Sequence, residues 1–274
     1  MTKTLMGLLM LVLISPAQAE DKPAYWELGL GFTGIAFPDY LGSKERNYWL
    51  LPFPYFVYRS EHLEVDRDAI TRELFDSPRW ELDINLSGSL PVSSDDNDLR
   101  RGMPDLDPIL EIGPVLKYQL HRLPANKGRF LLELPIRAAI ASDFTKIEYV
   151  GWRSNPRLRY EQERSGTNSN WILDVTLGPL FGTARYYDYF YSVDPQFVTS
   201  TRPAFEADGG FGGWRFAVGF SRRVGDLWYG GFVRYFDISA AEFADSPLVE
   251  TQHTLVGGFA IAWILKQSDR RNPR

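Results

Sequence analysis

The segment from Trp80 to Leu90 reads WELDINLSGSL, in which apolar and polar side chains alternate almost without interruption. Successive side chains of a β-strand point to opposite faces, so a period of two predicts a strand with one apolar and one polar face. One face of this segment suits lipid or a protein core, and the other suits water. The segment therefore predicts a half-buried strand and decides the fold class.

The same alternation recurs along most of the chain, which predicts an all-β protein. Five further segments show it clearly, and their larger apolar members are Trp26, Leu28, Leu30 and Phe32; Leu110, Ile112, Leu116 and Tyr118; Phe130, Leu132, Leu134, Ile136 and Ala138; Trp171, Leu173, Val175, Leu177 and Phe181; and Leu255, Phe259, Ile261, Trp263 and Leu265. There is no repeat of fixed period and no low-complexity tract. We expect a single domain.

Two kinds of β-protein share this pattern, a transmembrane barrel and a soluble sandwich or lipocalin-like barrel. A soluble barrel turns its apolar face inward and carries many Lys and Glu outside. Here the second face is rich in Gly, Ala, Ser and Thr, the chain contains 23 Gly, and aromatic residues make up 15% of it. Aromatic pairs near strand ends, such as Tyr25-Trp26, Tyr48-Trp49 and Trp228-Tyr229, are typical of the girdles around a lipid-facing band. These features favour a transmembrane antiparallel β-barrel.

The strand number follows from the lengths of the connections, since bacterial barrels have an even count with long loops on one side. Ten segments are strong candidates, namely residues 25–36, 47–58, 79–90, 109–120, 128–140, 148–162, 169–184, 212–223, 226–238 and 254–265. If residues 62–67 and 70–75 form a short hairpin, the count is twelve and the long connections 37–46, 91–108, 185–211 and 239–253 share one side. We expect twelve strands, and ten if no hairpin forms.

The first residues predict export. Lys3 supplies a positive charge, Leu5 to Ile14 form an apolar run, and Ala17-Gln18-Ala19 is a small-x-small cleavage site. The rival interpretation, a membrane-anchor helix, needs about 20 apolar residues, and Ser15-Pro16 ends the run before that length. We expect residues 1–19 to be a cleaved signal peptide and residues 20–274 to be a barrel in the outer membrane of a Gram-negative cell, in contact with its lipid.

Few residues suit catalysis or metal binding. The chain has no Cys and only three His, His62, His121 and His253, none of them beside an obvious Ser in a long connection. The acidic run Asp95-Asp96-Asn97-Asp98 lacks the ligand spacing and Gly of an EF-hand, so a solvated loop is expected. A net charge of -5 does not suit nucleic acid. We therefore predict no enzyme and no catalytic, cofactor-binding or metal-ligating residue.

Charged residues on the polar faces have a structural explanation. Glu81 and Asp83, with Lys117 and Arg137 on neighbouring strands, are expected to form ion pairs inside the barrel. The sequence allows two arrangements of Glu133, Arg137, Asp174 and Arg234, which either fill the lumen or line a channel. A small-solute pore is therefore one alternative function. A lipid-acting enzyme that depends on His253 is another.

Five stretches in the connections are more distinctive than the strands. They are Pro38 to Ser43 (PDYLGS), Arg100 to Leu106 (RRGMPDL), Tyr186 to Val193 (YYDYFYSV), Ser200 to Gly210 (STRPAFEADGG) and Asp245 to Val249 (DSPLV). In this order they resemble the MipA/OmpV family of MltA-interacting outer-membrane proteins. The resemblance implies a non-enzymatic scaffold that brings a murein lytic transglycosylase together with a penicillin-binding protein. For the OmpV branch it implies a surface antigen or adhesin.

Without the resemblance, the same stretches have ordinary interpretations. Gly42, Gly102, Pro104 and Pro247 are turn formers, which favours a structural role in the loops over a partner surface. The aromatic run from Tyr186 to Tyr191 is either an exposed recognition surface or part of a membrane girdle at a strand end.

Overall fold

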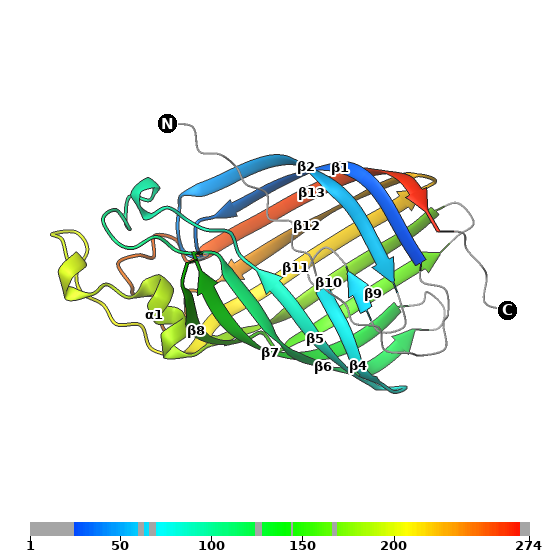
Figure 1. The fold of residues 1–274 in the computed structure, drawn as a ribbon. Helices are drawn as coiled ribbons and strands as arrows, with labels where there is room; N and C mark the ends of the chain where they lie inside the picture. Colours follow the sequence, from blue (N-terminus) through cyan, green and yellow to red (C-terminus); the bar gives the residue numbers. More distant parts are fainter. Residues whose placement is uncertain are drawn as a thin grey trace.

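The chain forms a closed antiparallel β-barrel in a computed structural model that describes residues 25–59, 63–65, 70–123, 128–143, 145–165 and 169–268 (Figure 1). Closure comes from the pairing of β1 with both β2 and β13 and of β10 with β11. The strands are β1 (Tyr25–Pro38), β2 (Arg46–Arg59), β3 (Leu63–Val65), β4 (Ile70–Asp76), β5 (Trp80–Gly88), β6 (Ile109–Leu123), β7 (Gly128–Ser142), β8 (Ile147–Ser154), β9 (Arg157–Ser165), β10 (Ser169–Gly182), β11 (Gly210–Val224), β12 (Leu227–Asp237) and β13 (His253–Gln267).

The thirteen strands occupy twelve positions around the ring, because β8 and β9 are two parts of one interrupted strand. Both pair with successive parts of β7 on one side and with β10 on the other. The interruption falls at Asn155-Pro156, where Pro156 has no N–H to donate. The buried Asn155 side chain donates to the Pro179 carbonyl at 2.7 Å in place of a ladder bond. The expectation of twelve strands is confirmed.

The short hairpin that decides this count is present as β3 and β4. Since neighbouring strands are antiparallel, the connections alternate between the two ends of the barrel. The four long connections, residues 39–45, 89–108, 183–209 and 238–252, therefore lie at the same end, on the left of Figure 1. We call this the loop end and the other the turn end. β1 begins and β13 ends at the turn end.

The apolar faces of the strands point outward. In β5, Ile84 is 36% exposed while its neighbour Asp83 is 1% exposed, and in β13 Phe259 and Trp263 are exposed while Ala262 is buried. A soluble barrel would show the reverse. The alternation of β5 predicts that Leu82, Ile84 and Leu86 point outward and that Asp83 and Asn85 point into the lumen. The exposure of Ile84, the burial of Asp83 and the buried Oδ1 atom of Asn85 agree with this prediction.

Outward-facing aromatic residues gather toward both ends of the barrel wall. Toward the loop end these are Tyr149, Trp152, Phe181, Trp214 and Tyr235, and toward the turn end Trp80, Tyr118, Phe130, Tyr160, Trp171 and Phe220. On β10, Trp171 and Phe181 lie ten residues apart. At about 3.3 Å per residue and a tilt of about 40°, they are about 25 Å apart along the barrel axis, the height of a lipid-facing band.

Candidate functional site

The four long connections pack on one another and form a structure that we call the loop cap. It has its own hydrophobic core, to which every long connection contributes. The buried residues of this core are Tyr40, Val92, Leu106, Tyr187, Tyr191, Val193, Ala207, Ile238, Ala241, Phe243 and Leu248. A shared core of this kind fixes the connections relative to one another, so the barrel carries an ordered surface at its loop end.

A short helix, α1 (Ala184–Tyr191), supplies the centre of the loop cap and was not predicted from the sequence. It places Tyr187 and Tyr191 one turn apart on the same face, and each is 4% exposed. Tyr191 stacks on Phe243 with 3.7 Å between ring centroids and donates its hydroxyl to the Leu41 carbonyl at 3.0 Å. Both predicted roles for these tyrosines, exposed recognition and membrane girdle, are therefore wrong. Because nearly every residue of this run is aromatic, the sequence shows no helical alternation of apolar and polar residues.

Two buried arginines connect the loops through backbone carbonyls. The Arg100 guanidinium donates to the Phe190 carbonyl at 2.9 Å and the Pro104 carbonyl at 3.2 Å, and lies 5.8 Å from the centre of the Tyr40 ring. Burial lowers the pKa of Arg100. Arg202 donates to the Phe197 carbonyl at 3.0 Å and to the Arg101 carbonyl at 3.2 Å. These contacts show that Arg100 and Arg202, which belong to two of the distinctive stretches, hold the long connections of the loop cap together.

The acidic run of residues 95–98 is divided by the fold. Asp95, Asp96 and Asp98 are exposed, as expected for a solvated loop, whereas Asn97 is fully buried. The Asn97 amide donates to Asp39 at 2.8 Å and to Ser43 at 3.1 Å, which joins the first long connection to the second. Within the described part of the chain, no group of three or more His, Cys, Asp or Glu residues could hold a metal ion.

The outer surface of the loop cap is acidic. It exposes ten carboxylate residues, Asp95, Asp96, Asp98, Asp105, Asp188, Asp194, Glu206, Asp208, Glu242 and Asp245, but only three basic ones, Lys44, Arg101 and Arg185. The turn end has the opposite balance. Of its described residues, Arg79, Arg122, Arg164, Arg222 and Lys266 are exposed, against Glu163 and Asp226. The two ends of the barrel would therefore attract partners of opposite charge.

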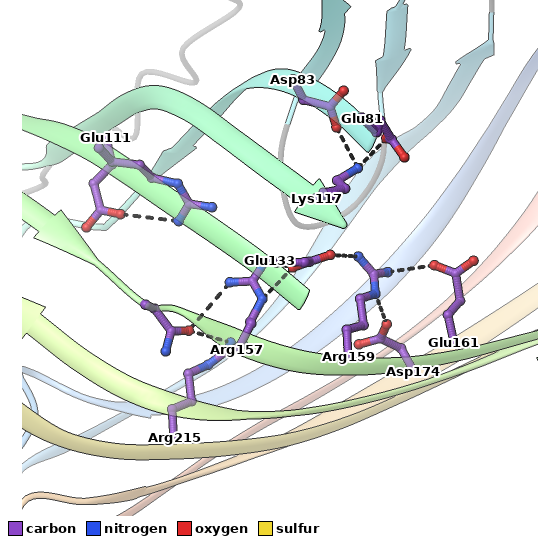
Figure 2. A network of polar contacts seen from close by, with 12 residues as sticks. Glu81, Asp83, Glu111, Lys117, Glu133, Arg157, Arg159, Glu161, Asp174 and Arg215 are labelled. Carbon is purple, nitrogen blue, oxygen red and sulfur yellow. Dashed lines mark hydrogen bonds and ion pairs between the residues drawn. The ribbon is translucent and has the colours of Figure 1, made fainter. Parts of the chain in front are cut away.

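One side of the lumen carries a ladder of ion pairs (Figure 2). Lys117 lies 2.6 Å from Glu81 and 2.5 Å from Asp83, as the sequence predicted. Farther along, Glu133 is completely buried and accepts from Arg157 at 2.6 Å and from Arg159 at 3.1 Å. Arg159 also contacts Asp174 and Glu161. A buried carboxylate with two guanidinium partners is electrostatically satisfied, so this part of the ladder is structural.

The sequence predicts that Arg137 pairs with Glu81 or Asp83, but the structure places it in a separate group around Glu111. Arg153 lies 2.8 Å from Glu111, while Arg137 lies 3.8 Å from it. The Arg137 Nε is buried and makes no hydrogen bond with any residue that the structure describes. Two cations share one carboxylate here, so the group carries an excess of positive charge. We call all these ionic side chains, from β5 to β10, the charged wall.

The opposite side of the lumen holds an apolar cluster next to a buried ion pair between Glu27 and Arg223, and Tyr55 of this cluster donates to Glu27 at 3.0 Å. Tyr55, Trp228, Ala262 and Ile264 form a buried cluster against which Phe53, Val57 and Ala260 pack, and we call these seven residues the apolar wall. Arg234, on β12, lies with its guanidinium 4.3 Å from the centre of the Phe232 ring. Of the four residues for which the sequence allows both a filled lumen and a channel, Glu133, Arg137 and Asp174 belong to the charged wall, and Arg234 lies on β12, outside it.

The histidines give no catalytic arrangement in the described part of the chain. His121 is exposed near the end of β6, and His62 lies outside the described residues. The Nδ1 of His253 is 2.9 Å from the Tyr235 hydroxyl and 3.8 Å from Asp237, and the ring is largely exposed. Among the described helices, none is long and apolar enough to cross a membrane.

Comparison with known proteins gives one result that covers nearly the whole barrel. No curated protein matches the sequence. The family model described as MltA-interacting protein MipA matches residues 30–265, from β1 to β13 and through every long connection of the loop cap. The chain therefore belongs to the MltA-interacting protein (MipA) family.

Proposed function

We propose that this protein is a non-enzymatic scaffold of the outer membrane that brings a murein hydrolase and a murein synthase together. The observation that supports the location is the outward-facing apolar band, about 25 Å high between two aromatic girdles, on a closed barrel. Membership of the MltA-interacting family supports a lytic transglycosylase as one partner. A penicillin-binding protein is the second partner that we propose. Cleavage after Ala19 would release residues 20–274.

The orientation follows from the lengths of the connections. Long loops of bacterial barrels face outward and short turns face the periplasm. The loop cap then lies on the cell surface, and the basic turn end faces the cell wall. Enzymes that act on murein are periplasmic in this arrangement, so they would meet the turn end. We therefore propose that the scaffold binds acidic surfaces of its partners through residues such as Arg122 and Lys266.

Charge reversal tests this assignment. Crosslinking in envelope membranes, followed by affinity purification, should capture a lytic transglycosylase with the wild-type chain. The double change Arg122→Glu and Lys266→Glu should reduce the capture. The matched change Asp194→Lys and Glu206→Lys on the loop cap should not. Loss of capture only in the loop-cap variant would contradict the proposal, because it would place the partner at the opposite end.

Surface labelling tests the orientation independently of any partner. An epitope inserted after Asp96 or near Gln196, both in the loop cap, should be labelled on intact cells. An epitope inserted between Gly225 and Asp226, in the turn between β11 and β12, should be labelled only after permeabilisation. Labelling of the Gly225 insertion on intact cells would reverse the orientation. We expect the same result for an epitope inserted at Ser60, which lies outside the described residues.

A small-solute pore is the second candidate function. It is favoured by the partial exposure of the charged wall, on which Arg153 and Arg159 each keep 28% of their side-chain surface accessible. Arg129, which lies 2.9 Å from Glu161 on the same wall, keeps 33%. Planar-bilayer recordings of the purified protein distinguish the two functions. Stable ionic conductance, increased by deletion of residues 195–205 from the loop cap, would favour the pore. Absence of conductance with retained partner capture would favour the scaffold.

A further inference from the structure

A hollow on the outer face of the barrel lies between β10 and β11, near the turn end (Figure 1). It is lined by Trp171, Leu173, Phe220 and Arg222, and its volume is about 340 Å³. These residues are two directly opposed pairs of the ladder, Trp171 with Arg222 and Leu173 with Phe220. Sites for small molecules begin at about 300 Å³, so the hollow has room for a segment of a lipid rather than for a whole one.

The side chains that line the hollow point to the outside of the barrel. Alternation along β10 places Trp171 and Leu173 on the face opposite to Asp174, which belongs to the charged wall of the lumen. Directly opposed residues of neighbouring strands share a face, so the paired residues of β11 also point outward. In agreement with this, Phe220 is 41% exposed, whereas the next residue, Ser221, is buried. The hollow therefore lies on the surface that meets the membrane.

The hollow lies at the height of the turn-end girdle. Trp171 and Phe220 belong to this girdle, and their ring centroids are 6.3 Å apart. Aromatic side chains of this kind mark the boundary between the acyl chains and the headgroups of a bilayer. Arg222 is the next outward residue of β11 after Phe220 toward the turn end, so its guanidinium lies on the headgroup side of the rings.

A second arginine lies beside the hollow. Arg164 of β9 is directly opposite Trp171, which therefore stands between Arg164 and Arg222 in one row of outward residues. Both arginines are exposed. From this row to the middle of the barrel, the outward residues of β9 to β12 that the structure describes include no Asp or Glu. Guanidinium groups bind phosphate through paired, charge-assisted hydrogen bonds, so this row suits an anionic phosphodiester.

We propose that the hollow binds one anionic phospholipid of the membrane leaflet at the turn end. The phosphodiester would pair with Arg164 and Arg222, and the first part of one acyl chain would lie on Leu173, between the rings of Trp171 and Phe220. The occupant is a lipid rather than free phosphate, because three of the four lining residues are apolar. This inference rests on the membrane placement proposed above, but it is independent of the scaffold role.

Native mass spectrometry of the folded protein in detergent tests the headgroup. The probes are phosphatidylglycerol and phosphatidylcholine with the same palmitoyl and oleoyl chains. We expect phosphatidylglycerol to bind about tenfold more tightly, the effect of one charge-assisted hydrogen bond, and Arg222→Gln to remove most of this preference. The control Arg79→Gln, which removes an exposed arginine next to the girdle residue Trp80, should leave the preference unchanged. Equal binding of the two lipids, or an equal effect of both variants, would overturn the headgroup site.

Filling the hollow tests the acyl-chain site separately from the charge. Leu173→Trp places a larger ring where the chain would lie and keeps both arginines, so it should weaken phosphatidylglycerol binding about as much as Arg222→Gln does. The control Leu265→Trp, on the outer face of β13, should have no effect, and heat-modifiable gel migration shows that both variants fold.

The same measurement distinguishes a lipid from other occupants of the hollow. Glycerophosphoglycerol, the headgroup without chains, should not compete with the lipid at the same concentration. Competition by it, or unchanged lipid binding to Leu173→Trp, would overturn the acyl-chain site. A dimer that Leu173→Trp dissociates would place a second copy of the chain on this face and would overturn the lipid site.

Fluorescence quenching in vesicles separates the lipid site from the membrane placement. The chain has no Cys, so Val175→Cys, the next outward position of β10, can be labelled with bimane without background. The vesicles contain a minor fraction of phosphatidylglycerol in phosphatidylcholine, with dibrominated chains on one lipid or the other. Per bromine, we expect phosphatidylglycerol to quench this label more strongly than phosphatidylcholine, and the two lipids to quench equally at Phe259→Cys on the exposed face of β13. Equal quenching at Val175→Cys would overturn the lipid site alone, and no quenching by either lipid would overturn the membrane placement as well.

Discussion

Replacing Ile84 with arginine tests which face of the barrel meets lipid. Ile84 points outward from β5, and its height follows from Trp80, a member of the turn-end girdle on the same strand. Four residues at about 3.3 Å, tilted by about 40°, place Ile84 about 10 Å above that girdle. The bilayer midplane lies at about 12 Å on this scale, half of a band about 25 Å high. Ile84 is therefore close to the midplane.

A charge at this depth should have nearly its full cost. Arginine on the lipid face at the midplane costs about 2 to 4 kcal/mol, a decrease of about 30- to 700-fold in the equilibrium constant for folding into lipid. Asn85, the next residue, faces the lumen beside two carboxylates, Glu81 and Asp83, and one ammonium group, Lys117. An arginine there faces carboxylates of the lumen, with which it can pair, instead of lipid. We expect Asn85→Arg to change stability by less than about 1 kcal/mol.

The assay is urea-dependent folding into lipid vesicles, followed by heat-modifiable gel migration. Ile84→Ala separates the loss of apolar surface from the effect of the charge, and it should lie close to wild type. If Asn85→Arg were as damaging as Ile84→Arg, or more so, the outward assignment of the apolar faces would be wrong. A soluble barrel with an apolar core would then be the better description.

Three further predictions concern the loop cap and the barrel wall. Asn97→Ala removes the hydrogen bonds of the Asn97 side chain with Asp39, Ser43, Glu45 and the Arg100 N–H and should destabilise the loop cap by about 1 to 3 kcal/mol. We expect faster proteolysis of residues 183–209 with unchanged barrel migration, whereas the exposed Asp95→Ala should have no effect. Burial raises the pKa of Tyr40 and Tyr191 above the value of about 10 in the unfolded chain. Above a pH of about 10 the folded loop cap therefore retains protons that the unfolded one releases. The stability of the loop cap should be constant below that pH and decrease above it. In proteolysis measured against pH, Tyr191→Phe should show a smaller decrease. Gly178→Ala would place a Cβ 2.0 Å from the Pro156 carbonyl oxygen, and we expect a lower urea midpoint than for Gly219→Ala, whose Cβ would have no neighbour closer than 3.9 Å.

Much of the barrel could be predicted from the sequence because its strands carry local information. Alternation in segments such as Trp80 to Leu90 specifies a strand and its two faces without reference to any distant residue. The even strand count and the placement of the long connections on one side then identified the weak hairpin of β3 and β4. The pairing of Lys117 with Glu81 and Asp83 followed from neighbouring strands alone.

The loop cap depends on the tertiary structure. Tyr40, Tyr187 and Phe243 are far apart in the sequence, and no local pattern shows that they share a core. Only the closed barrel brings the four connections together, which is why Tyr191 is buried rather than exposed.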